Sequence, residues 1–99
     1  MPTLKNIHPG EILLQDFLVP FGISYYKLAK NFHIPQTRIS EMVKGKRRIT
    51  ADTAMRLSKY FGNSAKFWLG IQDDFDIEEA QLSKASQLSS IKALITDAA

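Results

Sequence analysis

The sequence predicts an all-α fold built from five helices, and three observations support this prediction. Residues that favour helix starts and helix ends recur along the chain, and the apolar residues between them lie three or four positions apart, the spacing of one helix face. Apolar and polar residues nowhere alternate with the period of two that marks a half-buried strand, and no Asn-Gly or Asp-Gly pair marks a hairpin. We therefore expect helices and no β-sheet.

The first predicted helix starts at Pro9, because proline is favoured at the first helical position, where its missing N–H is not needed. Apolar residues follow at helical spacing: Ile12, Leu13, Phe17 and Leu18. Pro20 is expected to end this helix, since proline removes a backbone donor and crowds the preceding turn. Gly22 is placed in the turn that follows.

Two short helices with a tight break between them are predicted next. Ser24 is a favoured N-cap residue before a helix over residues 25–32, in which Leu28 and Ala29 face inward. Residues 33–35 (HIP) form the break, and a helix over residues 36–44 ends at Gly45, a residue type favoured just beyond helix ends. This order of helix, turn and helix is that of a helix-turn-helix unit formed by the second and third helices.

Two further helices complete the expected domain. Thr50 caps a helix over residues 51–61 that Gly62 ends, and Ser64 caps one from residue 65 to about residue 76. The last of these carries side chains expected in the core: Phe67, Trp68, Ile71 and Phe75. We therefore place a helix-turn-helix domain in residues 1–80, followed by a tail over residues 81–99 that is partly helical or flexible.

Length and composition suit one domain with a packed core. The chain has 99 residues, of which 44% are hydrophobic and none is cysteine, so it has to rest on packing alone, which suits the reducing cytoplasm in which we expect it. The first 20 residues lack a signal-peptide pattern, and no run of 18 apolar residues could cross a membrane.

The net charge of +3 conceals an uneven distribution. Residues 24–60 hold nine Lys or Arg against two acids, a balance of +7, whereas residues 65–99 hold three Lys against six acids, a balance of −3. A basic block points to a polyanionic partner and an acidic end to a different one. A basic block can equally be a solvated surface, so charge alone does not decide.

The helix over residues 36–44 has the pattern of a helix that reads DNA. Its apolar residues, Ile39, Met42 and Val43, lie three or four apart and are expected to face the core. Contacts to base edges in the major groove are expected from Gln36, Thr37, Arg38 and Ser40, because Gln pairs with adenine, Arg with guanine and a Thr methyl with thymine. Phosphate contacts are expected from Tyr25, Lys44, Lys46, Arg47 and Arg48.

Other kinds of site find little support in the sequence. The two histidines, His8 and His33, fall short of the three or four ligands of a zinc site, so we expect no metal and no cofactor. Acids cluster near a helix end rather than around a cleft, and neither a nucleophile with a His–acid partnership nor a Gly-rich phosphate loop is evident. We expect no catalytic residues and no enzyme.

The chain resembles the HigA/VapI-type antitoxins, a branch of the XRE (lambda-repressor-like) helix-turn-helix proteins. The resemblance rests on residues 8–13 (HPGEIL), 17–18, 20, 28–29, 38–41 (RISE), 45–47, 49–54 (ITADTA), 56–57, 61–62, 64, 67–69, 72 and 76. It implies a five-helix lambda-repressor-like domain that binds operator DNA as a homodimer. It also implies an antitoxin that neutralises a small ribonuclease toxin and represses their shared operon, in a type II toxin–antitoxin pair.

Two residues depart from the family pattern. His33 stands where glycine is usual in the turn, and a left-handed backbone there would strain histidine by about 1 kcal/mol. Gly70 replaces an asparagine and weakens its helix by up to about 1 kcal/mol relative to alanine.

A homodimer is expected, because one small module reads too few base pairs and two-fold pairing places the reading helices about 34 Å apart. Its predicted contacts are Leu69, Gln72 and Asp76.

Two alternative functions remain open at this point. One is a phage-type or metabolic helix-turn-helix repressor without a toxin, and the other is a protein-sequestering module that does not bind DNA. Within the antitoxin hypothesis, a basic toxin is expected to contact the acidic residues Asp73, Asp74, Glu78 and Glu79 rather than the basic block.

Overall fold

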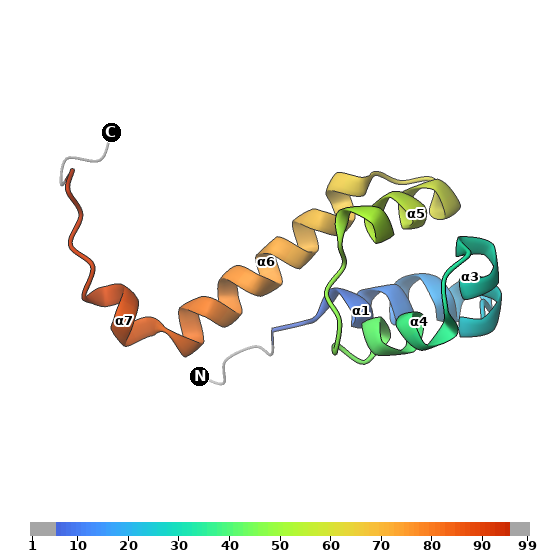
Figure 1. Ribbon diagram of the computed structural model, residues 1–99, viewed down its shortest axis with the longest axis horizontal. Coiled ribbons are helices and arrows are strands. Elements are labelled where there is room, and N and C mark those ends of the chain that lie inside the picture. Colours follow the sequence, from blue (N-terminus) through green and yellow to red (C-terminus); the bar gives the residue numbers. More distant parts are fainter. Residues whose placement is uncertain (1–5, 96–99) are drawn as a thin grey trace.

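The computed structural model describes residues 6–95, and this part of the chain is helical without strands (Figure 1). Its elements are α1 (Pro9–Ile12), the π-helix η1 (Leu13–Leu18), α2 (Val19–Phe21), α3 (Tyr25–Phe32), α4 (Gln36–Val43), α5 (Ala51–Phe61), α6 (Ala65–Ser83) and α7 (Ala85–Ser89). The all-α prediction is confirmed. Residues 1–5 and 96–99, the outer ends of the predicted domain and tail, lie outside the described residues.

The first predicted helix is a continuous rod of α1, η1 and α2, and it passes through Pro20 instead of ending there. In the wider π-helical turn the Val19 N–H donates to the Leu14 carbonyl five residues back. This arrangement admits Pro20 near the start of α2, where the missing donor leaves no bond broken. The rod ends at Gly22, whose left-handed backbone (φ 63°) closes the helix.

The predicted N-caps are confirmed for three helices. The hydroxyl oxygens of Ser24, Thr50 and Ser64 accept hydrogen bonds from the backbone N–H groups three residues later, at 3.0, 3.5 and 3.0 Å. The side chain of His8 caps α1 in the same way, because its Nδ1 accepts from the Gly10 N–H at 2.9 Å. These caps fix where each helix starts and therefore which side chains face inward.

One core draws on η1, α3, α4, α5 and α6 and on the loop before α5. Its buried apolar residues are Leu13, Leu18, Leu28, Ala29, Phe32, Ile39, Met42, Ile49, Ala54, Leu57 and Trp68. The prediction that Phe67 belongs to the core is wrong, since its side chain is 41% exposed. Adjacent positions on a helix point about 100° apart, so Trp68 takes the buried direction and Phe67 packs on its edge at 5.1 Å.

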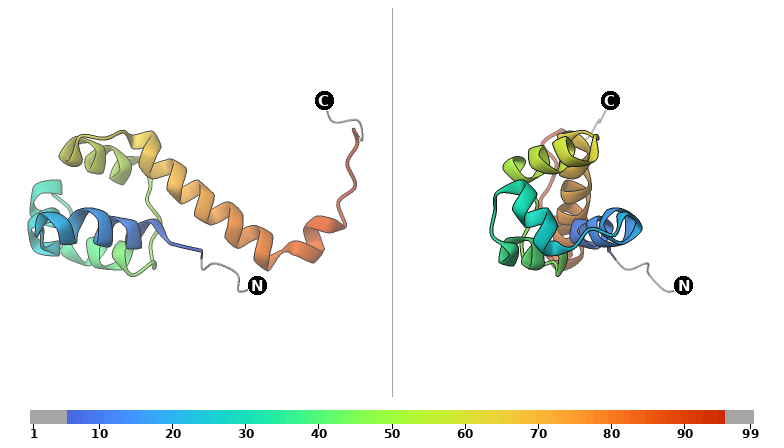
Figure 2. Two further views of the ribbon diagram at one scale, coloured as in Figure 1. Left: turned by 180° about the vertical axis from the view of Figure 1, so that it is seen from behind. Right: turned by 90° about the vertical axis from the view of Figure 1, so that its right-hand side faces the viewer.

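α6 is longer than predicted, because it continues past Asp76 to Ser83. The added residues are mostly good helix formers with no Gly or Pro to stop them. This second half projects away from the domain toward α7 (Figures 1 and 2). The predicted division after residue 80 therefore falls inside one helix. No helix within residues 6–95 is both long and apolar enough to cross a membrane.

The start of α1 packs directly against the end of α4. Gly10 is buried there, and a Cβ at this position would overlap the carbonyl oxygen of Met42. Only glycine permits this close approach of two backbones. The start of α1 thus supports the C-terminal end of α4.

His33 forms the turn between α3 and α4 in the left-handed conformation that the sequence suggested, with φ 58° and ψ 41°. Its N–H closes α3 by donating to the carbonyls of Ala29 and Lys30. The side chain is exposed, so nothing in the core depends on the imidazole.

Replacing His33 with glycine should leave stability unchanged or raise it by up to about 1 kcal/mol, because glycine adopts this backbone without steric strain. Urea unfolding of the wild type and His33→Gly measures the change. His33→Ala, which keeps a Cβ in the left-handed turn, is the matched control and should not be stabilised. A large loss in His33→Gly would show that the imidazole itself holds the turn.

Candidate nucleic-acid interface

α4 presents one side to the core and the other to solvent. Ile39 and Met42 are fully buried, whereas Gln36, Thr37 and Lys44 at the helix and its C-cap are exposed. Arg38 and Ser40 are half-buried at the border between the two sides. The prediction that the aliphatic side is anchored and the polar edge is exposed is therefore confirmed.

Arg38 lies beside the start of α5. The pKa of Asp52, in the first turn of α5, is lowered chiefly by a hydrogen bond from Arg56, and the charge of Arg38 contributes to the same shift. Arg38 is thus close enough to the first turn of α5 for its charge to act on Asp52. Its role as a base contact stays a prediction.

The connection between α4 and α5, residues 44–50, carries the basic cluster predicted to meet phosphates, and we call it the basic loop. Its backbone folds back on α4, since the N–H groups of Gly45 and Lys46 donate to the carbonyls of Met42 and Glu41 at 3.1 and 2.8 Å. The side chain of Ile49 anchors the loop in the core and has no exposed surface. The four basic side chains of the loop, Lys44, Lys46, Arg47 and Arg48, are all exposed.

Both arginines of the basic loop are paired with acids, which the sequence analysis did not predict. Arg47 donates to Glu41 of α4 at 3.1 Å, and Arg48 donates to Asp76 of α6 at 2.9 Å. The two guanidinium groups are therefore held by different helices. Asp76 was predicted only as a dimer contact, and no pattern in the sequence links it to Arg48.

The residues predicted as dimer contacts have interactions within one chain. Gln72 is 1% exposed and accepts a hydrogen bond from the Ile49 N–H at 2.7 Å, while Asp76 pairs with Arg48. Leu69 is half-buried against the core. The dimer contact at these three residues stays a prediction.

Tyr25 begins α3 directly after the Ser24 cap and is half-buried against the core. Its position next to the start of a helix is consistent with the predicted phosphate contact, which also stays a prediction.

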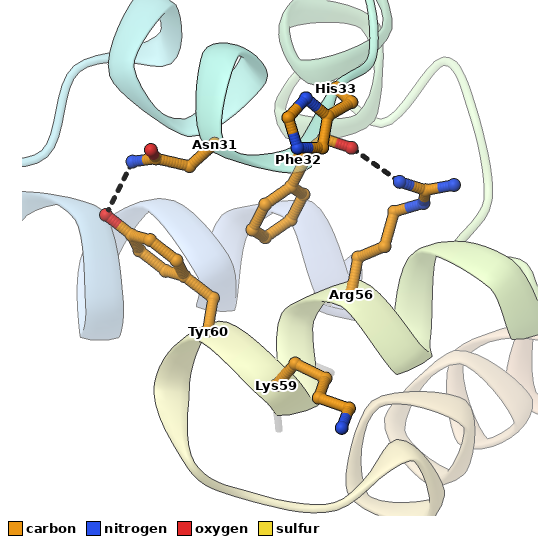
Figure 3. A pocket seen from close by; sticks show the side chains of 6 residues that line it. All are labelled: Asn31, Phe32, His33, Arg56, Lys59 and Tyr60. Carbon is orange, nitrogen blue, oxygen red and sulfur yellow. Dashed lines mark hydrogen bonds between the residues drawn. The ribbon is translucent and has the colours of Figure 1, made fainter.

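A shallow hollow at the end of α3 shows how α5 supports the turn (Figure 3). The Arg56 guanidinium donates to the Phe32 carbonyl and to Asp52, and Asn31 donates to the Tyr60 hydroxyl at 3.2 Å. These bonds satisfy a carbonyl at the C-terminal end of α3, where helices leave such groups unpaired. They hold the turn that orients α4.

His8 occupies the junction between α1, the basic loop and α6. Its ring lies edge-on to Phe75 at 4.8 Å, and an added Cβ at Gly45 would be 3.6 Å from it. Burial lowers the pKa of His8, and the charges of Asp76 and Glu11 oppose this shift. Within residues 6–95 no group of three or more His, Cys, Asp or Glu is placed to hold a metal ion.

A helix-turn-helix family profile matches residues 14–68, which span most of η1, α2, both motif helices, α5 and the start of α6. The chain belongs to the helix-turn-helix family. This is a family of DNA-binding regulators rather than enzymes, and the resemblance to HigA and VapI antitoxins inferred from the sequence is confirmed.

Three relatives illustrate the match. Virulence-associated protein I of Dichelobacter nodosus is 48% identical over 99% of this chain and 94% of its own length. The Pseudomonas aeruginosa antitoxin HigA, solved with the higBA promoter, is 36% identical with a TM-score of 0.87 over 92% of this chain and all of its own. The antitoxin GraA in complex with its operator is 28% identical with a TM-score of 0.87, over 97% and 98% of the two chains.

The depressed pKa of His8 makes this helix-turn-helix domain sensitive to mild acid. The folded state binds the proton less readily than the unfolded chain, whose histidine titrates near pH 6.5. Neutral His8 therefore contributes fully to the free energy of unfolding above about pH 6.5. This contribution is lost as the pH falls below that value, because a protonated Nδ1 can no longer accept the hydrogen bond that caps α1. Urea unfolding at about pH 7.5 and pH 5.5 should show this loss.

His8→Asn is the matched control for this experiment, because asparagine can cap the helix and does not titrate. It should lose less stability than the wild type between the two pH values. An equal loss in both proteins would place the pH dependence elsewhere in the chain.

Proposed function

We propose that the protein is a transcriptional repressor that binds operator DNA in the cytoplasm and serves as the antitoxin of a type II toxin–antitoxin pair. The observation that carries the DNA-binding part is the anchored aliphatic side of α4, which leaves Gln36 and Thr37 exposed at the start of the helix, with the exposed basic loop following its end. HigA of P. aeruginosa, solved with the higBA promoter, and GraA, solved with its operator, support DNA binding as the activity of this fold.

In this proposal the exposed edge of α4 enters the major groove. Gln36, Thr37, Arg38 and Ser40 contact base edges, where the groove offers a distinct pattern for each base pair. Phosphates are contacted by Tyr25 and by the basic loop residues Lys44, Lys46, Arg47 and Arg48. Each basic residue that meets a phosphate releases counterions, so the affinity falls as salt rises.

The repressor acts as a homodimer in this proposal. Two copies related by a two-fold axis present their α4 helices to successive turns of the major groove, which doubles the number of base pairs read. The chain alone leaves large aliphatic residues exposed after the domain core, among them Ile77, Leu82, Leu88 and Ile91. Such surface is available for contacts between copies or with another protein.

The antitoxin part rests on the relatives that carry this name and on the charge of α6. Asp73, Asp74, Glu78 and Glu79 are exposed on α6. Glu79 lies near the start of the basic loop, where it lines a hollow with Lys44 and Gly45. A small basic ribonuclease would be attracted to this segment and repelled by the basic loop. We place the toxin contact here.

A mobility-shift assay on the protein's own promoter separates the proposal from its alternatives. A salt-sensitive, sequence-selective shift supports the repressor, and its absence favours a module that only sequesters another protein. A neighbouring gene for a small basic ribonuclease distinguishes the antitoxin from a phage-type or metabolic repressor without a toxin.

Substitutions at Gln36 and Arg47 should affect DNA binding in different ways. Gln36→Ala should relax discrimination at one base-pair position by about 1–3 kcal/mol, because a base contact is lost. Arg47→Met should weaken binding to all sequences and reduce the salt slope by about one, because a phosphate contact is lost. Fluorescence anisotropy on matched and mutated operators at several salt concentrations measures both effects.

Lys84→Met removes the same charge at the far end of α6 and is the control for Arg47→Met; its salt slope should change less. If Gln36→Ala lowered affinity for every sequence equally, the assignment of Gln36 to base readout would be wrong.

Neutralising the four acids of α6 should weaken the toxin complex, because the attraction to a basic partner is lost. The combined variant Asp73→Asn, Asp74→Asn, Glu78→Gln and Glu79→Gln can be compared with the wild type by calorimetry against the purified neighbouring ribonuclease. Asp16→Asn, a change of charge on η1, should have little effect. An unchanged affinity in the combined variant would move the toxin contact to another surface.

A further inference from the structure

The basic loop forms hydrogen bonds to two helices, α4 and α6. α4 holds the first part of the loop through Glu41, whereas α6 holds the second part through Gln72 and Asp76. α6 is far along the chain from the helix-turn-helix unit, so these bonds are tertiary contacts across 23 and 28 residues.

Gln72 fixes the backbone of the loop where it enters the core. Its side chain is buried, its Oε1 accepts from the Ile49 N–H at 2.7 Å, and its Nε2 donates to Asp76 Oδ1 at 3.0 Å. Because both ends of the amide are used, its orientation is determined by the two partners. A buried N–H at Ile49 without an acceptor would be costly, so the loop is tied to this position.

Asp76 holds the side chain of Arg48, the residue directly before Ile49. Its Oδ1 accepts from Gln72 and its Oδ2 accepts from Arg48 at 2.9 Å. The carboxylate is thus oriented by a buried group on one side and presents its other oxygen to the guanidinium. The Arg48 side chain remains 53% exposed, and its guanidinium has five N–H donors, so it can bind Asp76 and a phosphate together.

We infer that Gln72 and Asp76 are positioning residues for DNA binding, which orient Arg48 toward the phosphate backbone before DNA arrives. The inference rests on the proposed function. A free arginine loses substantial rotamer entropy when it is immobilised in a complex, and a side chain that is already ordered loses less. Arg48 is therefore a pre-oriented phosphate contact, and α6 contributes to DNA affinity without touching DNA.

Simple electrostatics and a positioning role of Asp76 predict opposite changes in operator affinity when Asp76 is neutralised. Removing an acid near DNA should raise affinity if the acid acts only through its charge. If Asp76 orients Arg48, Asp76→Ala should instead lower operator affinity, roughly three- to tenfold, the equivalent of one hydrogen bond. Asp73→Ala removes the same charge one turn earlier on α6 and is the matched control, for which a small rise is expected.

A double-mutant cycle identifies Arg48 as the residue through which Asp76 acts. Operator affinity is measured by fluorescence anisotropy for the wild type, Asp76→Ala, Arg48→Ala and the double variant, with folding checked by thermal melts. The double variant should bind as Arg48→Ala does, since orienting an absent side chain has no effect. A rise of affinity in Asp76→Ala, or losses that multiply in the double variant, would overturn the inference.

Hydrogen exchange tests the positioning step without DNA. Gln72→Met keeps the volume of the side chain and removes the acceptor, so the Ile49 amide should exchange at least several-fold faster while the amides of the α5 interior keep their protection. Unchanged exchange at Ile49 would overturn the role of Gln72. If the wild type bound no DNA at any salt concentration while Gln72→Met still released Ile49, the proposed function would fall and the loop restraint would stand.

Discussion

The burial of Ile39 and Met42 is the constraint on which the rest of the molecule depends. α4 is only eight residues long and would not hold its shape alone in water. Its two buried side chains contact a core that also contains Leu13, Leu28 and Trp68, so helices from both ends of the domain fix its rotation about its own axis. That rotation decides which residues point outward. The polar edge stays exposed because the burial of Ile39 and Met42 prevents α4 from rotating about its axis.

Three contacts from different parts of the chain support α4. Gly10 lets the first helix touch the end of α4, Arg56 of α5 holds the turn at its start, and Gln72 of α6 holds the loop beyond it. Each support reaches a carbonyl or an N–H of the backbone rather than a side chain of the reading edge. The exposed residues Gln36 and Thr37 take no part in these supports, which is the arrangement expected of a rigid scaffold that presents a binding surface.

The sequence predicted the local features of this fold better than its long-range ones. Helix boundaries at Ser24, Thr50 and Ser64 follow from capping chemistry that acts within three residues, and the turn at His33 follows from backbone sterics. Pro20 misled the prediction because a π-helical turn, which depends on the packing of the whole rod, relieves the usual conflict. The acid partners of Arg47 and Arg48 were not predicted, since nothing local distinguishes a paired surface arginine from a free one.

The separation between scaffold and reading edge has a consequence for how such proteins diverge. Exposed positions such as Gln36 and Thr37 tolerate substitution at little cost to folding, whereas Gly10 tolerates none without moving two helices. Under the proposed function, gene duplicates of this chain can therefore acquire new operators through changes at exposed positions of α4. The same duplicates would have to preserve the glycine that carries no information about DNA at all.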